Sequence, residues 1–240
     1  NVTIPEGVTS IGTSAFRDCS SITDIVIPES VTSIEDYFLY GCTSLSSVTI
    51  NSNADIKSNS FGNCTSITKI KLNSSIISSW FNDYTSIQEV VLGDSVTEID
   101  NAFYGCTGLK KITLGNGVKE IVGCSFEGCT GLTSVTIPNS VTTIRHTAFR
   151  GCTALEELHI EDGNSKLLIG PDDDPFYVVC FSNCPIKRLY LGRSIDIIRG
   201  LACPFGNKIN SLTISDSVTS IGEGAFYGCT DLTSVTIPES

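Results

Sequence analysis

The stretch Leu132-Thr-Ser-Val-Thr-Ile-Pro-Asn-Ser-Val-Thr-Thr-Ile-Arg-His-Thr-Ala-Phe149, followed by Arg-Gly-Cys152, decides the fold because it returns along the whole chain. It starts again at Leu232 and occurs in altered form between Ile22 and Cys42. The apolar residue that opens each unit recurs mostly every 22 or 23 residues, with one interval of 20 and one of 31. These opening residues are Val2, Ile25, Val48, Ile70, Val90, Ile112, Val135, Leu158, Leu189, Leu212 and Val235. A fixed repeat of this length predicts a solenoid of stacked units.

Each unit is expected to contain two short apolar segments joined by turns. The alternation of Val135 and Ile137 places both side chains on one face of a strand. Pro138 cannot donate a ladder hydrogen bond, so it ends that strand. A second apolar segment follows, and the Ala-Phe-x-x-Cys segment after it is predicted to form a turn or a helical turn. This last segment turns a set of phenylalanines inward: Phe16, Phe61, Phe103, Phe126, Phe149, Phe181 and Phe226.

One unit cannot bury this much apolar surface alone, but stacked units bury a continuous core. We therefore predict an α/β repeat solenoid dominated by β-structure. A parallel sheet would cover one face, and short strands or helical turns would cover the other. Residues 1–240 would form a single solenoid of about ten repeats of about 23 residues, with an insertion near 161–181.

The repeat resembles the leucine-rich repeat superfamily, and within it the Treponema-type repeats of BspA-like surface proteins. The phrases that carry this resemblance are Ile-Pro-x-Ser-Val-Thr-x-Ile, at 137–144, and Ala-Phe-x-x-Cys-x-x-Leu, at 225–232. The resemblance implies a right-handed, curved leucine-rich-repeat stack with a parallel sheet lining one face. It also implies export to a cell surface, and adhesion to host or neighbouring-cell proteins.

Composition narrows the classes of partner. The net charge of −11 argues against nucleic acid and against adsorption to an anionic membrane. The sequence contains no apolar run long enough to cross a bilayer, so we expect no membrane insertion. The chain opens and closes inside a unit, which we interpret as a fragment of a longer chain. Open ladder edges at its two ends would favour end-to-end self-association.

Eleven cysteines require an explanation. Eight share one slot of the repeat, which predicts a ladder of buried thiols that pack as small apolar groups. They are Cys19, Cys42, Cys64, Cys106, Cys129, Cys152, Cys184 and Cys229, with Tyr84 in the same slot of the shortest unit. The other three, Cys124, Cys180 and Cys203, have local disulfide pairing as an alternative.

The sequence offers no catalytic constellation, and we expect neither an enzyme nor a cofactor. His146 and His159 lie in no nucleophile or metal motif. Cys180 and Cys184 have an i, i+4 spacing without a second ligand pair, so we expect no zinc site. The acidic run Asp172, Asp173 and Asp174 lies in the insertion and lacks the alternating ligands of a calcium loop. A solvated acidic loop is therefore favoured, with calcium binding as the alternative.

The informative positions are those where the repeat departs from its own pattern. Outward strand positions are mostly threonine and serine near the two ends, but charged or aromatic in the middle. The departing residues are Lys69, Lys71, Glu89, Lys111, Glu157, His159, Arg188 and Tyr190. They predict a mixed-charge strip that contacts a partner, with Asp172, Asp173 and Asp174 in an adjacent loop. Random drift on a solvated sheet is the alternative explanation.

The leading functional hypothesis is an extracellular scaffold that binds a protein or glycoprotein, possibly host-derived, through its strand-lined face. The second hypothesis is a passive spacer that displays another domain of the parent protein. A curved solenoid with a decorated inner strip favours binding, and a straight solenoid with a plain surface favours a spacer.

Overall fold

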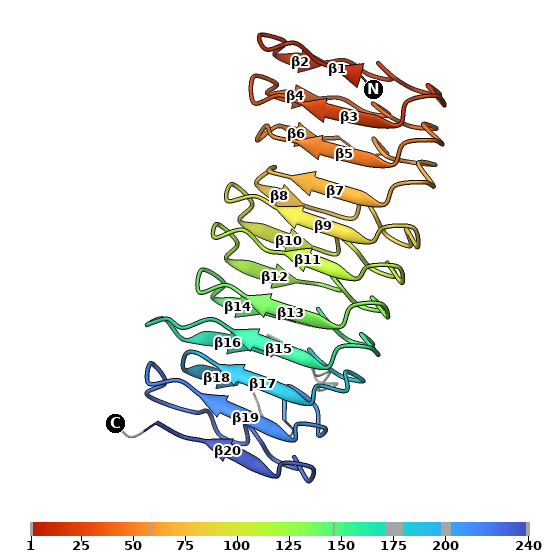
Figure 1. The fold of residues 1–240 in the computed structure, drawn as a ribbon. Helices are drawn as coiled ribbons and strands as arrows, with labels where there is room; N and C mark the ends of the chain where they lie inside the picture. Colours follow the sequence, from red (N-terminus) through yellow and green to blue (C-terminus); the bar gives the residue numbers. More distant parts are fainter. Residues whose placement is uncertain (1, 58, 146, 171–179, 198–202, 239–240) are drawn as a thin grey trace.

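The computed structural model describes residues 2–57, 59–145, 147–170, 180–197 and 203–238 of the chain. The chain winds through successive coils that stack into an elongated column (Figure 1). Residues near the N-terminus form one end of the column, and residues near the C-terminus form the other (Figure 1).

Two rows of short parallel strands run along the column, one on its front face and one on its rear face (Figure 1). The front face contains β1 (Val2–Thr3), β3 (Asp24–Ile27), β5 (Ser47–Ile50), β7 (Lys69–Leu72), β9 (Glu89–Leu92), β11 (Lys111–Thr113), β13 (Ser134–Ile137), β15 (Glu157–Ile160), β17 (Arg188–Leu191), β19 (Ser211–Ile214) and β20 (Ser234–Thr236). The rear face contains β2 (Ser10–Ile11), β4 (Ser33–Ile34), β6 (Asp55–Ile56), β8 (Ile76–Ile77), β10 (Glu98–Asp100), β12 (Glu120–Val122), β14 (Thr143–Ile144), β16 (Leu167–Ile169) and β18 (Ile195–Ile197).

Equivalent residues of neighbouring coils lie side by side. Val135 pairs with Leu158, and Leu158 pairs with Leu189, although the second pair is separated by the long repeat. The longer repeat therefore does not shift the register of the front strands. The predicted stacking of layers is confirmed by this register.

The predicted helical turns are wrong, because the residues that the structure describes contain strands and turns but no helix. The backbone of the Ala-Phe-x-x-Cys segment bonds between coils: the Phe126 N–H donates to the Ala148 carbonyl at 2.7 Å, and the Gly128 N–H to the Arg150 carbonyl at 2.8 Å. These N–H groups are therefore not available to the i−4 carbonyls that a helix requires.

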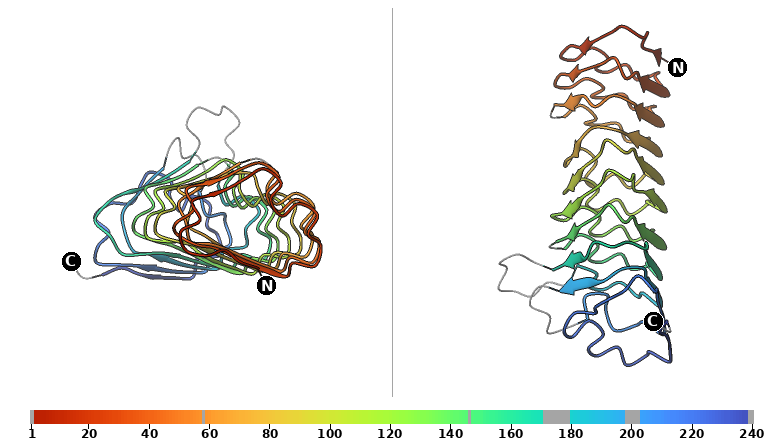
Figure 2. Two further views of the ribbon diagram at one scale, coloured as in Figure 1. Left: turned by 90° about the horizontal axis from the view of Figure 1, so that it is seen from above. Right: turned by 90° about the vertical axis from the view of Figure 1, so that its left-hand side faces the viewer.

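The column is nearly straight in one view, whereas the family resemblance implied a curved one (Figure 2, right). Seen from above, successive coils are displaced sideways (Figure 2, left). The outward strand residues therefore lie along an extended face.

Phenylalanines from successive coils stack inside the column, as predicted. The ring centroids of Phe126 and Phe149 lie 5.1 Å apart, and those of Phe149 and Phe181 lie 5.0 Å apart with planes only 4° apart. Phe61 and Phe103 are also buried, and Phe16 and Phe226, in the end coils, are partly buried. Burial of each ring contributes roughly 1.5–3 kcal/mol, and ring pairing adds about 0.5–1.5 kcal/mol.

The predicted ladder of thiols is also present, and all eleven cysteines are free. The ladder thiols are donors as well as apolar groups. The Cys106 Sγ–H donates to the Phe81 carbonyl at 3.0 Å, and the Cys152 Sγ–H donates to the Phe126 carbonyl at 3.1 Å. Each bond joins one coil to the preceding coil. Cys19, in the first coil, is exposed.

The hydrogen-bonded strand ladders divide at one position on each face. On the front face, β11 ends one sheet and β13 begins the next. On the rear face, β6 ends a three-stranded sheet and β8 begins a six-stranded one. The two divisions lie in different coils, so each coil remains tied to its neighbours on at least one face.

Candidate functional site

The eight predicted residues on the front strands form a strip of outward side chains, which we call the front strip. The alternation of each strand turns its apolar residues inward and these residues outward: in β15, Glu157 and His159 are exposed while Leu158 and Ile160 are buried. Lys69 and Lys71 lie on β7, Glu89 on β9, Lys111 on β11, Glu157 and His159 on β15, and Arg188 and Tyr190 on β17.

The structure divides the front strip into two clusters. In the first, Glu89 lies between Lys69 and Lys111, with carboxylate-to-ammonium distances of 4.0 Å and 3.2 Å. Lys71 lies beside Val91 in the register, on the same coil as Lys69. These ion pairs are exposed, so they orient side chains and contribute little to stability.

The second cluster combines an ion pair with an aromatic stack. Glu157 pairs with Arg188, and the rings of His159 and Tyr190 stack 4.4 Å apart with planes 6° from parallel. Attraction to Glu157, chiefly through their hydrogen bond, raises the pKa of Arg188. The two contacts hold four side chains of adjacent strands in one arrangement.

A second ion pair lies just before these strands. Lys187 Nζ lies 2.6 Å from Glu156 Oε1. The hydrogen bond from Lys187 lowers the pKa of Glu156. The neighbourhood of the second cluster therefore carries two cation–carboxylate pairs.

Asp162 also belongs to the second cluster, although its role was not predicted from the sequence. Its carboxylate accepts a hydrogen bond from the Tyr190 hydroxyl, at 3.0 Å and 3.1 Å from its two oxygens, and another from Ser215. Asp162 lies just after β15, at the start of the long repeat. It connects three consecutive coils and fixes the orientation of Tyr190.

Two shallow depressions mark the surface around the front strip. One, of about 200 Å³, is lined by Glu157, His159, Arg188, Tyr190 and the neighbouring Ser211 and Thr213. The other, of about 350 Å³, lies where the front sheets divide, between Lys111 and Glu161. Plain Ser134 and Thr136 of β13 separate the two clusters, so the first cluster does not contact the second. The predicted loop residues Asp172, Asp173 and Asp174 lie outside the described residues.

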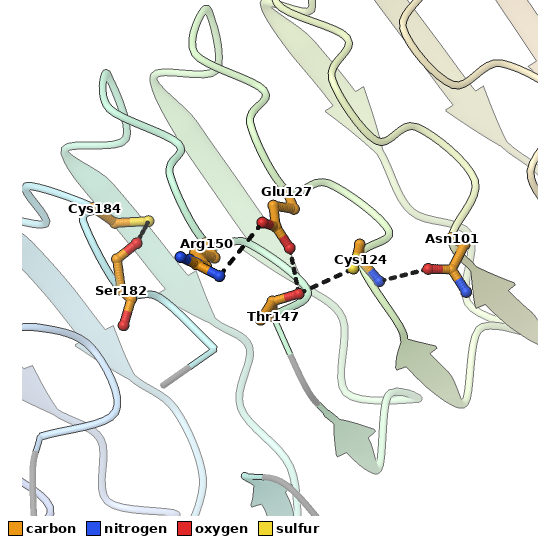
Figure 3. Close-up of polar contacts among 7 residues, drawn as sticks. All are labelled: Asn101, Cys124, Glu127, Thr147, Arg150, Ser182 and Cys184. Carbon is orange, nitrogen blue, oxygen red and sulfur yellow. Dashed lines mark hydrogen bonds and ion pairs between the residues drawn. The ribbon is translucent and has the colours of Figure 1, made fainter. Parts of the chain in front are cut away.

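A further polar cluster lies on the turn side of three adjacent coils (Figure 3). The Cys124 N–H donates to Asn101 Oδ1 at 2.9 Å, and the Cys124 Sγ lies 3.2 Å from Thr147 Oγ1. Thr147 also bonds to Glu127, whose carboxylate lies 3.8 Å from Arg150 (Figure 3). Burial raises the pKa of the Cys124 thiol, and a protonated thiol is a poor nucleophile. The cluster therefore links three adjacent coils through polar side chains.

Two negative findings concern the described part of the chain. No group of three or more His, Cys, Asp or Glu side chains there is arranged to hold a metal ion. No helix there is long and apolar enough to pass through a lipid bilayer.

The coils, their register and the inward ladders define a leucine-rich-repeat type of parallel β-solenoid. The family model of the BspA type leucine rich repeat region matches residues 1–101, 74–170 and 175–240, in six copies. The chain belongs to this BspA-type leucine-rich repeat family.

Solved structures agree with this fold. A leucine-rich repeat protein from Bacteroides ovatus is 24% identical, with a TM-score of 0.56 over 99% of this chain and 74% of that one. The leucine-rich repeat protein of T. pallidum is 29% identical, with a TM-score of 0.52 over 64% of this chain and 77% of that one. No curated protein matches the chain.

Proposed function

We propose that the chain is a non-enzymatic, cell-surface scaffold that binds a protein or glycoprotein partner through the front strip. The observation that carries this proposal is the second cluster, in which an ion pair and an aromatic stack lie side by side. Arginine and tyrosine are the residues that most often anchor protein interfaces. Here Arg188 and Tyr190 are adjacent outward residues of one strand.

Preorganisation supports the same proposal. Binding orders flexible side chains at a cost of about 0.5–1.5 kcal/mol for each one. Glu157 already holds Arg188, while His159 and Asp162 already hold Tyr190. The side chains of the cluster are therefore already ordered in the folded protein, so binding a partner costs them little further conformational entropy.

The cell-surface part of the proposal follows from the family to which the chain belongs. The BspA-like resemblance associates such repeats with export and with adhesion, including adhesion to host proteins. An acidic chain with a locally mixed-charge strip suits such a partner, because charge complementarity guides association and selects against wrong partners.

A second function, a passive spacer that displays another domain, is favoured by the nearly straight column (Figure 2). A spacer requires length and rigidity but no surface cluster. The two functions predict different outcomes when the front strip is altered.

The experiment measures binding of the protein to immobilised extracellular-matrix proteins and glycoproteins, first for the wild type and then for a double variant. Arg188→Ala with Tyr190→Ala is expected to weaken binding at least tenfold, roughly 1.4 kcal/mol or more. The matched control is Ser47→Ala with Thr49→Ala, at the equivalent positions of β5. Wild-type affinity in the Arg188 and Tyr190 variant would refute the proposed surface, and absence of any partner would favour the spacer.

A further inference from the structure

The shortest repeat of the chain opens the rear face. Only 20 residues separate Ile70 from Val90 at the start of successive front strands. In this region β6 and β8 lie on consecutive coils but belong to different sheets. The facing edges of two sheets present backbone N–H and C=O groups that a neighbouring strand does not use.

Trp80 occupies a slot that a small residue fills in most coils, although the buried Phe38 fills it in the second coil. The residue before the ladder phenylalanine is Ala102 or Ala148 in regular coils, and both alanines are fully buried. An indole does not fit the volume of a methyl group without displacing the layers around it. Trp80 is accordingly only partly buried, packed against the core on one side and lining the opening on the other.

Beside this break, the turns that follow β6 and β8 line a cavity of about 640 Å³. This volume falls within the range of about 300–1,000 Å³ that small-molecule sites occupy. Its lining combines the aromatic rings of Trp80 and Tyr84 with the amides of Asn59, Asn63 and Asn82. A second depression, of about 200 Å³, shares Asn63, Asn82 and Tyr84 with the first, so the hollow extends along the coil edge.

One polar atom among the lining residues lacks a hydrogen-bond partner. The Oδ1 of Asn82 is buried and has no hydrogen-bond partner. Leaving a buried acceptor unpaired costs roughly 1–3 kcal/mol, so a turn of the Asn82 side chain toward a donor in the cavity would be favourable. Side-chain amides donate and accept at once, which suits a ligand with many hydroxyl groups.

The charge of the lining limits the ligand to a neutral one. Although the chain carries a net charge of −11, no carboxylate of the described residues lines the larger cavity, and Asp83 lines only the adjoining depression. Among the described residues of its lining, only Lys57 is charged, and its ammonium is already paired with Asp55. Within the larger cavity, an anionic ligand would therefore meet only a paired cation, and a cationic ligand would meet no carboxylate of the described residues.

We propose that the Trp80 cavity is a binding site for a neutral oligosaccharide. The apolar face of a pyranose ring would lie on the indole of Trp80. Hydroxyl groups at the ring edge would bond to the Asn59, Asn63 and Asn82 amides. This site lies on the turn side of the column, next to β6, away from the front strip, and it does not depend on the partner proposed above.

The chain carries its own probe for this site, because Trp80 is its only tryptophan. An array of neutral oligosaccharides, with acidic ones included for comparison, would be followed by titration of tryptophan fluorescence. At least one neutral oligosaccharide is expected to change the emission in a saturable way, and acidic ones are not. An array without a neutral binder, or with binding restricted to acidic glycans, would overturn the proposal.

Two variants assign the binding to the cavity by calorimetry. Trp80→Ala is expected to abolish it, and Ser79→Arg, at an exposed residue of the lining, is expected to block the opening without disturbing the core. The matched control is Ser75→Arg, an exposed serine of the same coil outside the lining. Oligosaccharide binding that survives Ser79→Arg with an unchanged melting curve would contradict the assignment.

Discussion

The hydroxyl of Tyr84 donates a hydrogen bond to the carbonyl oxygen of Phe61, in the coil before it. The same carbonyl also accepts the N–H of Cys64, so it serves two donors from two coils. In the next coil, Cys106 makes the equivalent bond to the Phe81 carbonyl with its thiol. The requirement at this slot is therefore a donor that reaches the preceding coil, and Tyr84 meets it where the ladder has no cysteine.

Removal of this donor should destabilise the column. We expect Tyr84→Phe to lower the free energy of unfolding by about 1 kcal/mol, because the Phe61 carbonyl loses a bond that water does not replace inside the stack. Urea denaturation measures the change. Tyr104→Phe, at an exposed tyrosine, is the control and should have no effect; equal losses in both variants would argue against the coil-to-coil bond.

The thiol ladder should make the protein sensitive to alkali. Burial raises the pKa of Cys106 from 9.0 to about 12. Between these values the thiol is ionised in the unfolded chain but protonated in the folded one. The unfolded state then binds fewer protons, so stability falls as the pH rises through this window. One such thiol contributes a slope of about 1.4 kcal/mol per pH unit.

Urea unfolding at several pH values from about 8 to about 11 tests this coupling. Cys106→Ser keeps a donor for the Phe81 carbonyl but does not ionise in this range. Its loss of stability with pH should be shallower than that of the wild type. Parallel curves for the two proteins would show that Cys106 is not shielded from ionisation.

The stability of the coils around the long repeat should depend on the side chain of Arg193. This side chain is fully buried, and its guanidinium donates to the carbonyl oxygens of Asn139 at 2.6 Å and Pro138 at 3.0 Å, two coils earlier. Its hydrogen bonds therefore link two coils that are separated by the coil with the long repeat. We expect Arg193→Met to cost roughly 3 kcal/mol, because a buried and a partly buried carbonyl lose a charged donor.

The control for Arg193 is Lys71→Met, which removes an exposed cation from the front face and should change stability by no more than about 0.5 kcal/mol. Thermal melting followed by circular dichroism measures both. If Arg193→Met lowers the free energy of unfolding by less than about 1 kcal/mol, the guanidinium does not stabilise the coils around the long repeat.

Much of the fold could be predicted from the sequence because the same pattern of apolar residues recurs in every repeat. Val135, Ile137 and Phe149 each have counterparts one repeat away, and stacking is the arrangement that buries them all. The helical turns were mispredicted because a short apolar segment does not reveal whether its N–H groups bond within the coil or between coils. In this protein they alternate: the Phe126 N–H bonds to the next coil, whereas the Cys129 N–H bonds to Phe126 of its own coil.

The candidate site was predictable only in part. Strand alternation indicates that Arg188 and Tyr190 face outward, since inward positions must be apolar. It does not show that Asp162, 28 residues earlier, bonds to Tyr190, because that contact depends on how side chains of adjacent coils meet. The opening beside Trp80 depends on side-chain volume against neighbouring coils, which no pattern along the chain describes.

The central claim is that consecutive coils share one continuous apolar core in register. Adjacent residues of β13 test it: Ile137 is fully buried beside Ile160, while Thr136 faces solvent beside His159. The measurement is cooperative thermal unfolding of Ile137→Asp compared with Thr136→Asp. We predict that Ile137→Asp abolishes the single cooperative transition and that Thr136→Asp keeps it; a wild-type transition in Ile137→Asp would contradict the stacked core.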